Sequence, residues 1–187
     1  MIVGHFMLNV IEANAFVFGC SETREAILID AGEFPAAIPE FVEAHNLNLN
    51  TIFITHDHYD HVAGLEEAAK HFGATVIAGT PQPGGFAVDR VVKHGDEITV
   101  GRHVGRIVDT SGHTPVMLSL IFPGHVFSAD ALFAGSVGGT STPELHEQEI
   151  DLIRKNLFDL PGDYEVHVGH GPSTTIEIER TYNPFFV

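Results

Sequence analysis

The sequence predicts an α/β protein in which β-sheets carry helices on their outer sides. Between residues 25 and 78, apolar runs typical of strands alternate with amphipathic segments typical of helices. The chain also divides into two similar halves, each a β-rich run followed by a helix. Histidines and aspartates cluster where predicted strands end, which is where a sandwich of two sheets would gather them. The length of 187 residues favours one domain spanning 1–187.

In the first half, short apolar runs separated by turn residues predict strands over 6–10, 15–19 and 25–30. A helix is predicted over 35–45, because Ile38, Phe41 and Val42 share one face and Pro35 suits a first turn. A strand over 47–55 follows. A helix over 65–72 should end at Gly73, and another strand covers 75–78.

The second half opens with a loop over 79–85, where Gly and Pro are concentrated. Strands are predicted over 90–92, 97–100 and 106–109, followed by a hairpin of 117–122 and 125–128. The segment 145–157 reads as an amphipathic helix, with Leu145, Ile150, Ile153 and Leu157 on its apolar face. A last strand over 164–168 and a short helix over 174–182 complete the pattern.

Four residues able to bind a metal come directly after the strand predicted over 47–55: His56, His58, Asp60 and His61. Imidazole and carboxylate are ligands that zinc and iron accept. Two histidines one residue apart in an extended segment point the same way, so they can share one metal ion. Asp60 and His61 follow where the chain turns, and they can face a second ion. The pattern therefore predicts a metal site at a strand-to-helix turn.

With three later segments, this motif resembles the metallo-β-lactamase-fold hydrolases, and most closely the small glyoxalase II-like group. Residues 56–61 match the His-x-His-x-Asp-His motif of that family. Residues 111–115 resemble its Gly-His-Thr-Pro motif, 127–133 its Gly-Asp-Thr-Leu-Phe motif, and 169–172 its Gly-His-Gly-Pro motif. The resemblance implies a four-layer αββα sandwich of two mixed β-sheets with helices on the outer faces.

The resemblance also implies a dinuclear metallohydrolase. Two divalent ions, zinc foremost but also iron or a zinc–iron pair, would share a bridging hydroxide that cleaves a thioester such as S-lactoylglutathione or a related acyl-thiol. Asp60 would also act in catalysis, by orienting the hydroxide or taking up its proton. Asp30 either supports the metal-bound histidines without binding the metal itself or is an ordinary aspartate in the turn at a strand end. The implied ligands are His56, His58 and His113 at one ion, Asp60, His61 and His170 at the other, and Asp130 bridging both.

Two other functions stay open. An iron-dependent persulfide dioxygenase shares this fold and would place one iron on His56, His113 and Asp130. A non-catalytic metal-binding domain is the other, because Gly139 and Ser141 stand where the family often has arginine and aspartate. Two relatives are disfavoured. His58 occupies a position that is glutamate in flavodiiron proteins, and Asp130 replaces the cysteine of the largest zinc β-lactamase class.

The composition limits the partners. A net charge of −16 with 9 basic residues disfavours nucleic acid, whose binding depends on Lys and Arg. The acidic surface does not favour anionic glutathione either, and the basic helical extension of larger glyoxalase II enzymes is not found before Val187. No secretory signal and no long apolar run are evident, so a cytoplasmic protein that does not enter a membrane is expected. The oligomeric state is left open.

The chain has 13 histidines, and seven that lie outside these motifs are expected to be ordinary surface or packing residues. They are His5, His45, His71, His103, His125, His146 and His167.

Overall fold

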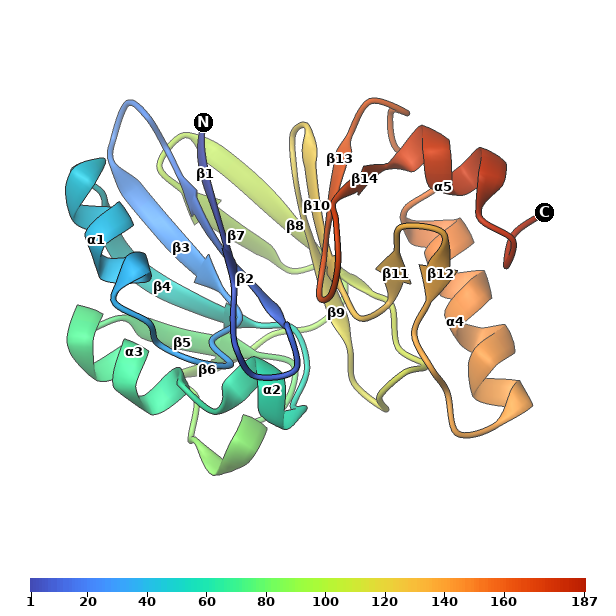
Figure 1. The fold of residues 1–187 in the computed structure, drawn as a ribbon, viewed down its shortest axis with the longest axis horizontal. Helices are drawn as coiled ribbons and strands as arrows, with labels where there is room; N and C mark the ends of the chain where they lie inside the picture. Colours follow the sequence, from blue (N-terminus) through green and yellow to red (C-terminus); the bar gives the residue numbers. More distant parts are fainter. The chain divides into compact units, whose positions relative to one another are not determined.

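A computed structural model describes residues 1–187. They form two compact units, one of residues 1–92 and 98–104, and the other of 93–97 and 105–187 (Figure 1). The predicted α/β class, with two mixed sheets and helices packed against them, is confirmed. That residues 1–187 act as one domain stays a prediction. No helix is long and apolar enough to cross a membrane.

The first unit is built on a six-stranded sheet of order β1-β2-β3-β4-β5-β6. Strands β1, β2 and β3 are antiparallel to one another in turn, whereas β3, β4, β5 and β6 run parallel. Because β3 and β4 are parallel neighbours, both end at the same edge of the sheet. The strands are β1 (Ile2–Met7), β2 (Asn14–Gly19), β3 (Glu25–Ile29), β4 (Asn48–Ile54), β5 (Thr75–Ala78) and β6 (Arg90–Val91).

Helices α1 (Ala37–Ala44) and α3 (Leu65–Phe72) pack on this sheet (Figure 1). Ile38 of α1 and Leu65 of α3 are almost fully buried in one cluster with Leu28 and Ile52 of the strands. Gly73 ends α3 in the left-handed conformation, with φ of 60°, as predicted. A single helical turn, α2 (Tyr59–Val62), and a short 3₁₀ segment, η1 (Pro83–Gly85), also belong to this unit.

The second six-stranded sheet has the order β14-β13-β10-β9-β8-β7. Strand β9 is antiparallel to both β8 and β10, and β10 is parallel to β13. Strands β8, β10 and β13 therefore all point the same way. The strands are β7 (Glu97–Val100), β8 (His103–Asp109), β9 (Leu118–Phe122), β10 (His125–Ala129), β13 (Glu165–Val168) and β14 (Thr174–Thr175), and a small separate hairpin pairs β11 (Leu132–Phe133) with β12 (Ser136–Val137).

Helices α4 (Pro143–Asn156) and α5 (Ile176–Tyr182) pack on the second sheet. Ile153 and Ile176 are fully buried in one cluster with Val126 and Val166 of the strands. The Thr142 hydroxyl accepts a hydrogen bond from the Leu145 backbone N–H at 3.3 Å, so it caps the first turn of α4.

Several predicted boundaries were wrong. The first strand covers 2–7 rather than 6–10, because the chain turns after Met7. Ile11 and Glu12 have positive φ values of 52° and 55°, and the Leu8 backbone N–H donates to the Ala13 carbonyl at 2.8 Å. The helix predicted over 174–182 starts at Ile176, where the Thr175 side chain caps it. The β11–β12 hairpin was not predicted, because strands of two residues show no periodicity.

Candidate metal centre

The first group of predicted ligands lies at the edge where β3 and β4 end. Asp30 follows β3, and Thr55 and His56 follow β4. Asp30 adopts the left-handed conformation, with φ of 58°. Its Oδ1 accepts a hydrogen bond from the Thr55 backbone N–H at 2.9 Å, and its Oδ2 lies 2.8 Å from both the Thr55 hydroxyl and His61 Nδ1. Asp30 therefore orients His61, which is the supporting role that the resemblance implied.

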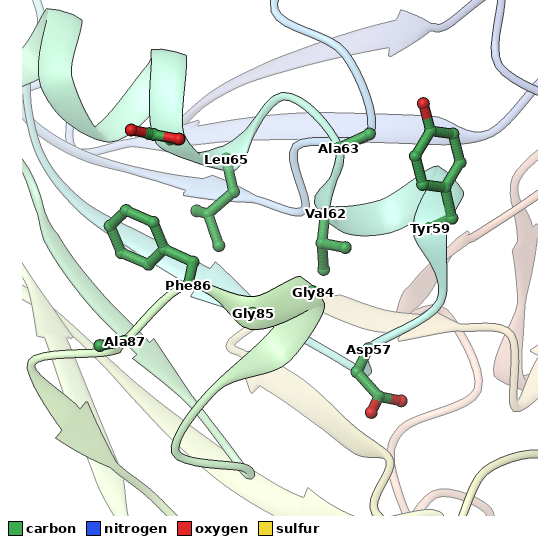
Figure 2. A pocket seen from close by; sticks show the side chains of 10 residues that line it. Asp57, Tyr59, Val62, Ala63, Leu65, Gly84, Gly85, Phe86 and Ala87 are labelled. Atoms are coloured by element: carbon green, nitrogen blue, oxygen red, sulfur yellow. The ribbon is translucent and has the colours of Figure 1, made fainter.

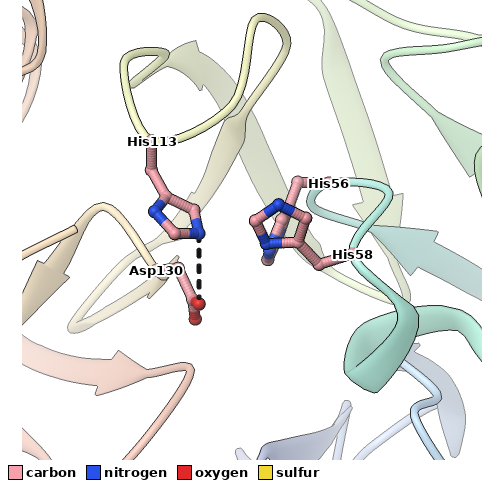
Figure 3. Close-up of side chains that lie close together, drawn as sticks. All are labelled: His56, His58, His113 and Asp130. Carbon is pink, nitrogen blue, oxygen red and sulfur yellow. Dashed lines mark ion pairs between the residues drawn. The ribbon is translucent and has the colours of Figure 1, made fainter. Parts of the chain in front are cut away.

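The predicted histidines of this unit are gathered together. The ring centroid of His56 lies 4.8 Å from that of His58 (Figure 3) and 4.3 Å from that of His61. Asp60 Oδ2 lies 3.5 Å from His61 Nε2. A side chain at Gly32 would overlap the Asp60 backbone carbonyl, so only glycine lets the loop after β3 approach the motif so closely. All four residues that the sequence singled out between 56 and 61 thus share one local cluster.

The second group lies at the edge where β8, β10 and β13 end. His113, Asp130 and His170 follow these three strands in turn. Asp130 Oδ2 lies 3.6 Å from His113 Nε2, drawn as a dashed line in Figure 3, and 3.5 Å from His170 Nε2. A Cβ at Gly169 would overlap the Asp130 carboxylate. The three predicted ligands of this unit therefore come together, with the aspartate between two imidazoles.

The protein holds three of these imidazoles through Nδ1. His61 Nδ1 lies 2.8 Å from Asp30, His113 Nδ1 lies 2.7 Å from the Gly139 carbonyl, and His56 Nδ1 lies 3.0 Å from the Thr55 hydroxyl. A histidine that binds a metal with one ring nitrogen usually makes such a hydrogen bond with the other. In each case Nε2 is the atom left to face a metal, so the residues fit a divalent ion with nitrogen and oxygen ligands.

Glu149 is a buried acidic residue beside His113 that the sequence did not lead us to expect. Its side chain on α4 is fully buried, and Oε1 accepts a hydrogen bond from the His113 backbone N–H at 3.2 Å. Burial, followed by the negative charge of Asp130, raises the pKa of Glu149 to about 8, although the His113 N–H acts in the opposite direction. The sequence did contain a clue, because position 149 falls between Leu145 and Ile153 at i+4 spacing, on the apolar face of the helix.

A pocket of about 610 Å³ opens beside the histidine motif in the first unit (Figure 2). Its volume is within the range typical of sites for small molecules. Val62, Leu65 and Phe86 give it an apolar wall, and Asp57 and Glu66 add carboxylates. No lysine or arginine lines it.

Comparisons with known proteins agree with the resemblance seen in the sequence. Residues 8–170 match the family model described as the metallo-β-lactamase superfamily. A hydroxyacylglutathione hydrolase of Idiomarina loihiensis is 34% identical over 152 residues, which are 80% of this chain and 58% of that protein. A hydroxyacylglutathione hydrolase GloC of Haemophilus influenzae is 29% identical, over 95% of this chain and 97% of that protein. The chain thus spans less than two thirds of the first relative and nearly all of the second.

Two solved structures are also similar over most of the chain. BLEG-1, named a B3 metallo-β-lactamase, is 25% identical, with a TM-score of 0.87 and full coverage of both chains. ETHE1 from Myxococcus xanthus is 29% identical, with a TM-score of 0.85, and the match covers 98% of this chain and 84% of that one.

Proposed function

Because this chain belongs to the metallo-β-lactamase superfamily, we propose that it is a dinuclear metallohydrolase that cleaves the thioester of a small acyl-thiol. His56, His58 and His113 would hold one divalent ion, and Asp60, His61 and His170 would hold the other. Asp130 would be shared between the two. Zinc is the first choice of metal, with iron or a zinc–iron pair as the alternatives.

The anchoring of the histidines carries this proposal. Asp30, Thr55 and the Gly139 carbonyl each engage an Nδ1 atom, which supports Nε2 as the metal-facing atom at three positions. Gly139 stands where relatives often have arginine. The contact with His113 Nδ1 uses the backbone carbonyl of Gly139, so it does not need an arginine side chain.

Two ions held by these residues would lower the pKa of coordinated water to about 7 and would polarise a carbonyl oxygen. A side chain of the protein acts on the attacking hydroxide. In this proposal Asp60, at the start of α2 with its Oδ2 3.5 Å from His61 Nε2, orients the attacking hydroxide or takes up its proton. A thiolate leaves with little help from an acid, so no further proton donor is required.

The charges that line the pocket affect which thiol the substrate can carry. The curated relatives are named for a glutathione thioester, which supports S-lactoylglutathione as a substrate. The carboxylates of Asp57 and Glu66, with no lysine or arginine beside them, repel the anionic glutathione group. We therefore propose a thioester of an uncharged or cationic thiol as the preferred substrate, with S-lactoylglutathione as a poorer one.

Persulfide oxidation by a single iron is the second candidate, and the likeness to ETHE1 is the observation that favours it. In that case one iron rests on His56, His113 and Asp130. A non-catalytic metal-binding domain is the third.

Assays of protein loaded separately with zinc and with iron distinguish these functions. We expect hydrolysis of S-lactoylglutathione and of an N-acetylcysteamine thioester, with the higher kcat/KM for the latter. A β-lactam belongs in the panel because of the likeness to BLEG-1. Oxygen consumption with glutathione persulfide, without thioester hydrolysis, would establish the second candidate, and inactivity of both loaded forms towards every substrate would establish the third.

Reversing the charge of Glu66 tests the proposed role of the pocket. Glu66→Lys replaces a repulsive carboxylate with a cation, so we expect the KM for S-lactoylglutathione to fall about fivefold, corresponding to roughly 1 kcal/mol. The KM for the N-acetylcysteamine thioester should stay the same. Glu67→Lys is the matched control, because Glu67 is its exposed neighbour on α3 but does not line this pocket. An equal change in both variants would show only a general effect of charge.

A further inference from the structure

A second group of metal-binding side chains lies in the sheet of the second unit, outside the candidate metal centre. His125 is the first residue of β10, and Glu165 is the first residue of β13. These strands pair in parallel, with His125 opposite Glu165 and Phe127 opposite His167. Side chains two residues apart in a strand share a face, so His125, Glu165 and His167 all project from the same face of the sheet.

The three donor atoms form a compact triangle. His125 Nδ1 lies 3.0 Å from His167 Nε2, and Glu165 Oε2 lies 3.8 Å from the first nitrogen and 3.9 Å from the second. The ring centroids of the two histidines are 5.2 Å apart, and two imidazoles on one tetrahedral zinc have a separation of roughly 5 Å. The nitrogens are a few tenths of an ångström closer than the roughly 3.3 Å between two ligands on zinc, so a small rotation of either ring suffices.

Neighbouring residues hold the His167 ring in place. Phe127 packs parallel to it, with centroids 4.7 Å apart and an angle of 22° between the planes. The Ser173 hydroxyl lies 3.4 Å from His167 Nδ1, on the far side of the ring from His125. When Nδ1–H donates to this hydroxyl, Nε2 accepts a hydrogen bond from His125 Nδ1–H, and an ion bound between the two nitrogens would take the place of that proton.

We propose that His125, Glu165 and His167 form a further binding site for a divalent transition metal such as zinc. Two imidazoles and a carboxylate are a known ligand set for this ion. The His167 side chain is only 3% exposed and that of Glu165 is 50% exposed, so the ion binds at a rim that water reaches and can complete its coordination. Both histidines were expected to be ordinary surface or packing residues.

The site is separate from the candidate metal centre but shares its strands. His125 and Glu165 stand where β10 and β13 begin, whereas Asp130 and His170 follow the ends of the same strands. Five residues of strand separate the two positions by roughly 16 Å. An ion at this site ties β10 to β13, the strands that deliver Asp130 and His170.

Equilibrium dialysis against buffered zinc chloride, followed by counting zinc per chain, tests the site. We expect His125→Gln to bind one zinc fewer than the unaltered protein. The same loss of one zinc should occur when His125→Gln is made in an Asp130→Asn background, so the result does not depend on the proposed catalytic ions. Ser173→Ala should weaken zinc binding at this site about tenfold, because it removes the partner of Nδ1.

His71→Gln is the control, because His71 is an exposed histidine on α3 in the other unit. Its zinc count should not change. Glu165→Gln alters a half-exposed side chain, and it should lower the affinity at least tenfold. Equal zinc counts for the unaltered protein, His125→Gln and Glu165→Gln, with all three folded by circular dichroism, would overturn the proposal. So would loss of one zinc from the control.

Discussion

Replacing Asp130 with asparagine should lower the kcat/KM for thioester hydrolysis at least a thousandfold while leaving the protein folded. Asp130 Oδ2 lies 3.5 Å from His170 Nε2 and 3.6 Å from His113 Nε2, and a bridge between two cations would rely on the negative charge of this carboxylate. Asparagine keeps the shape but offers one neutral oxygen. A metal contribution of several kcal/mol to the transition state corresponds to about a thousandfold in rate. The measurement is kcat/KM together with metal content.

Stability should not fall in this variant. The Asp130 carboxylate is buried, and its negative charge raises the pKa of Glu149. Without a metal, this buried charge lowers the free energy of unfolding. Asp151→Asn, on the exposed side of α4, is the control and should keep full activity and metal content. If Asp130→Asn retained more than a tenth of the activity with both ions bound, the bridging role would be wrong.

The sequence was most informative where a structural feature is local. Residues 65–72 form the predicted helix, which ends at Gly73 as expected. The histidine motif follows directly after β4, as predicted. The first strand was misplaced because Val10 reads as a strand residue, although the strand ends at Met7 and Val10 lies in the turn that follows. Two-residue strands such as β11 and β12 carry no pattern at all.

Contacts between distant strands were harder to predict. Asp30 orients His61 only because β3 and β4 are parallel neighbours, and the sequence left its role undecided between support and turn. His125 lies 42 residues before His167, and only the register of β10 against β13 brings it to Glu165 and His167. Periodicity reports which face of an element is buried, whereas pairing between elements depends on the whole fold.

Glu149 should make the stability of the metal-free protein fall as the pH rises from about 5 to 8. Its pKa is about 8 in the folded chain and near the ordinary value of 4.5 once unfolded. Between these values the unfolded chain has released the proton that the folded chain still holds, so rising pH favours unfolding. The stabilising contribution is complete below pH 4.5 and is lost as the pH passes through 8. Glu149→Gln cannot ionise, so it should escape this loss.

Urea unfolding in the presence of a chelator measures the difference. The free energy of unfolding of Glu149→Gln should be close to that of the unaltered protein at pH 5 and higher by roughly 2–4 kcal/mol at pH 8, since each unit of pKa shift is about 1.4 kcal/mol. Glu147→Gln, an exposed residue of the same helix, should leave the pH profile unchanged. Parallel pH profiles for the unaltered protein and Glu149→Gln would mean that Glu149 is already ionised in the fold. Its hydrogen bond to His113 would then be that of a carboxylate, and burial would not set its charge.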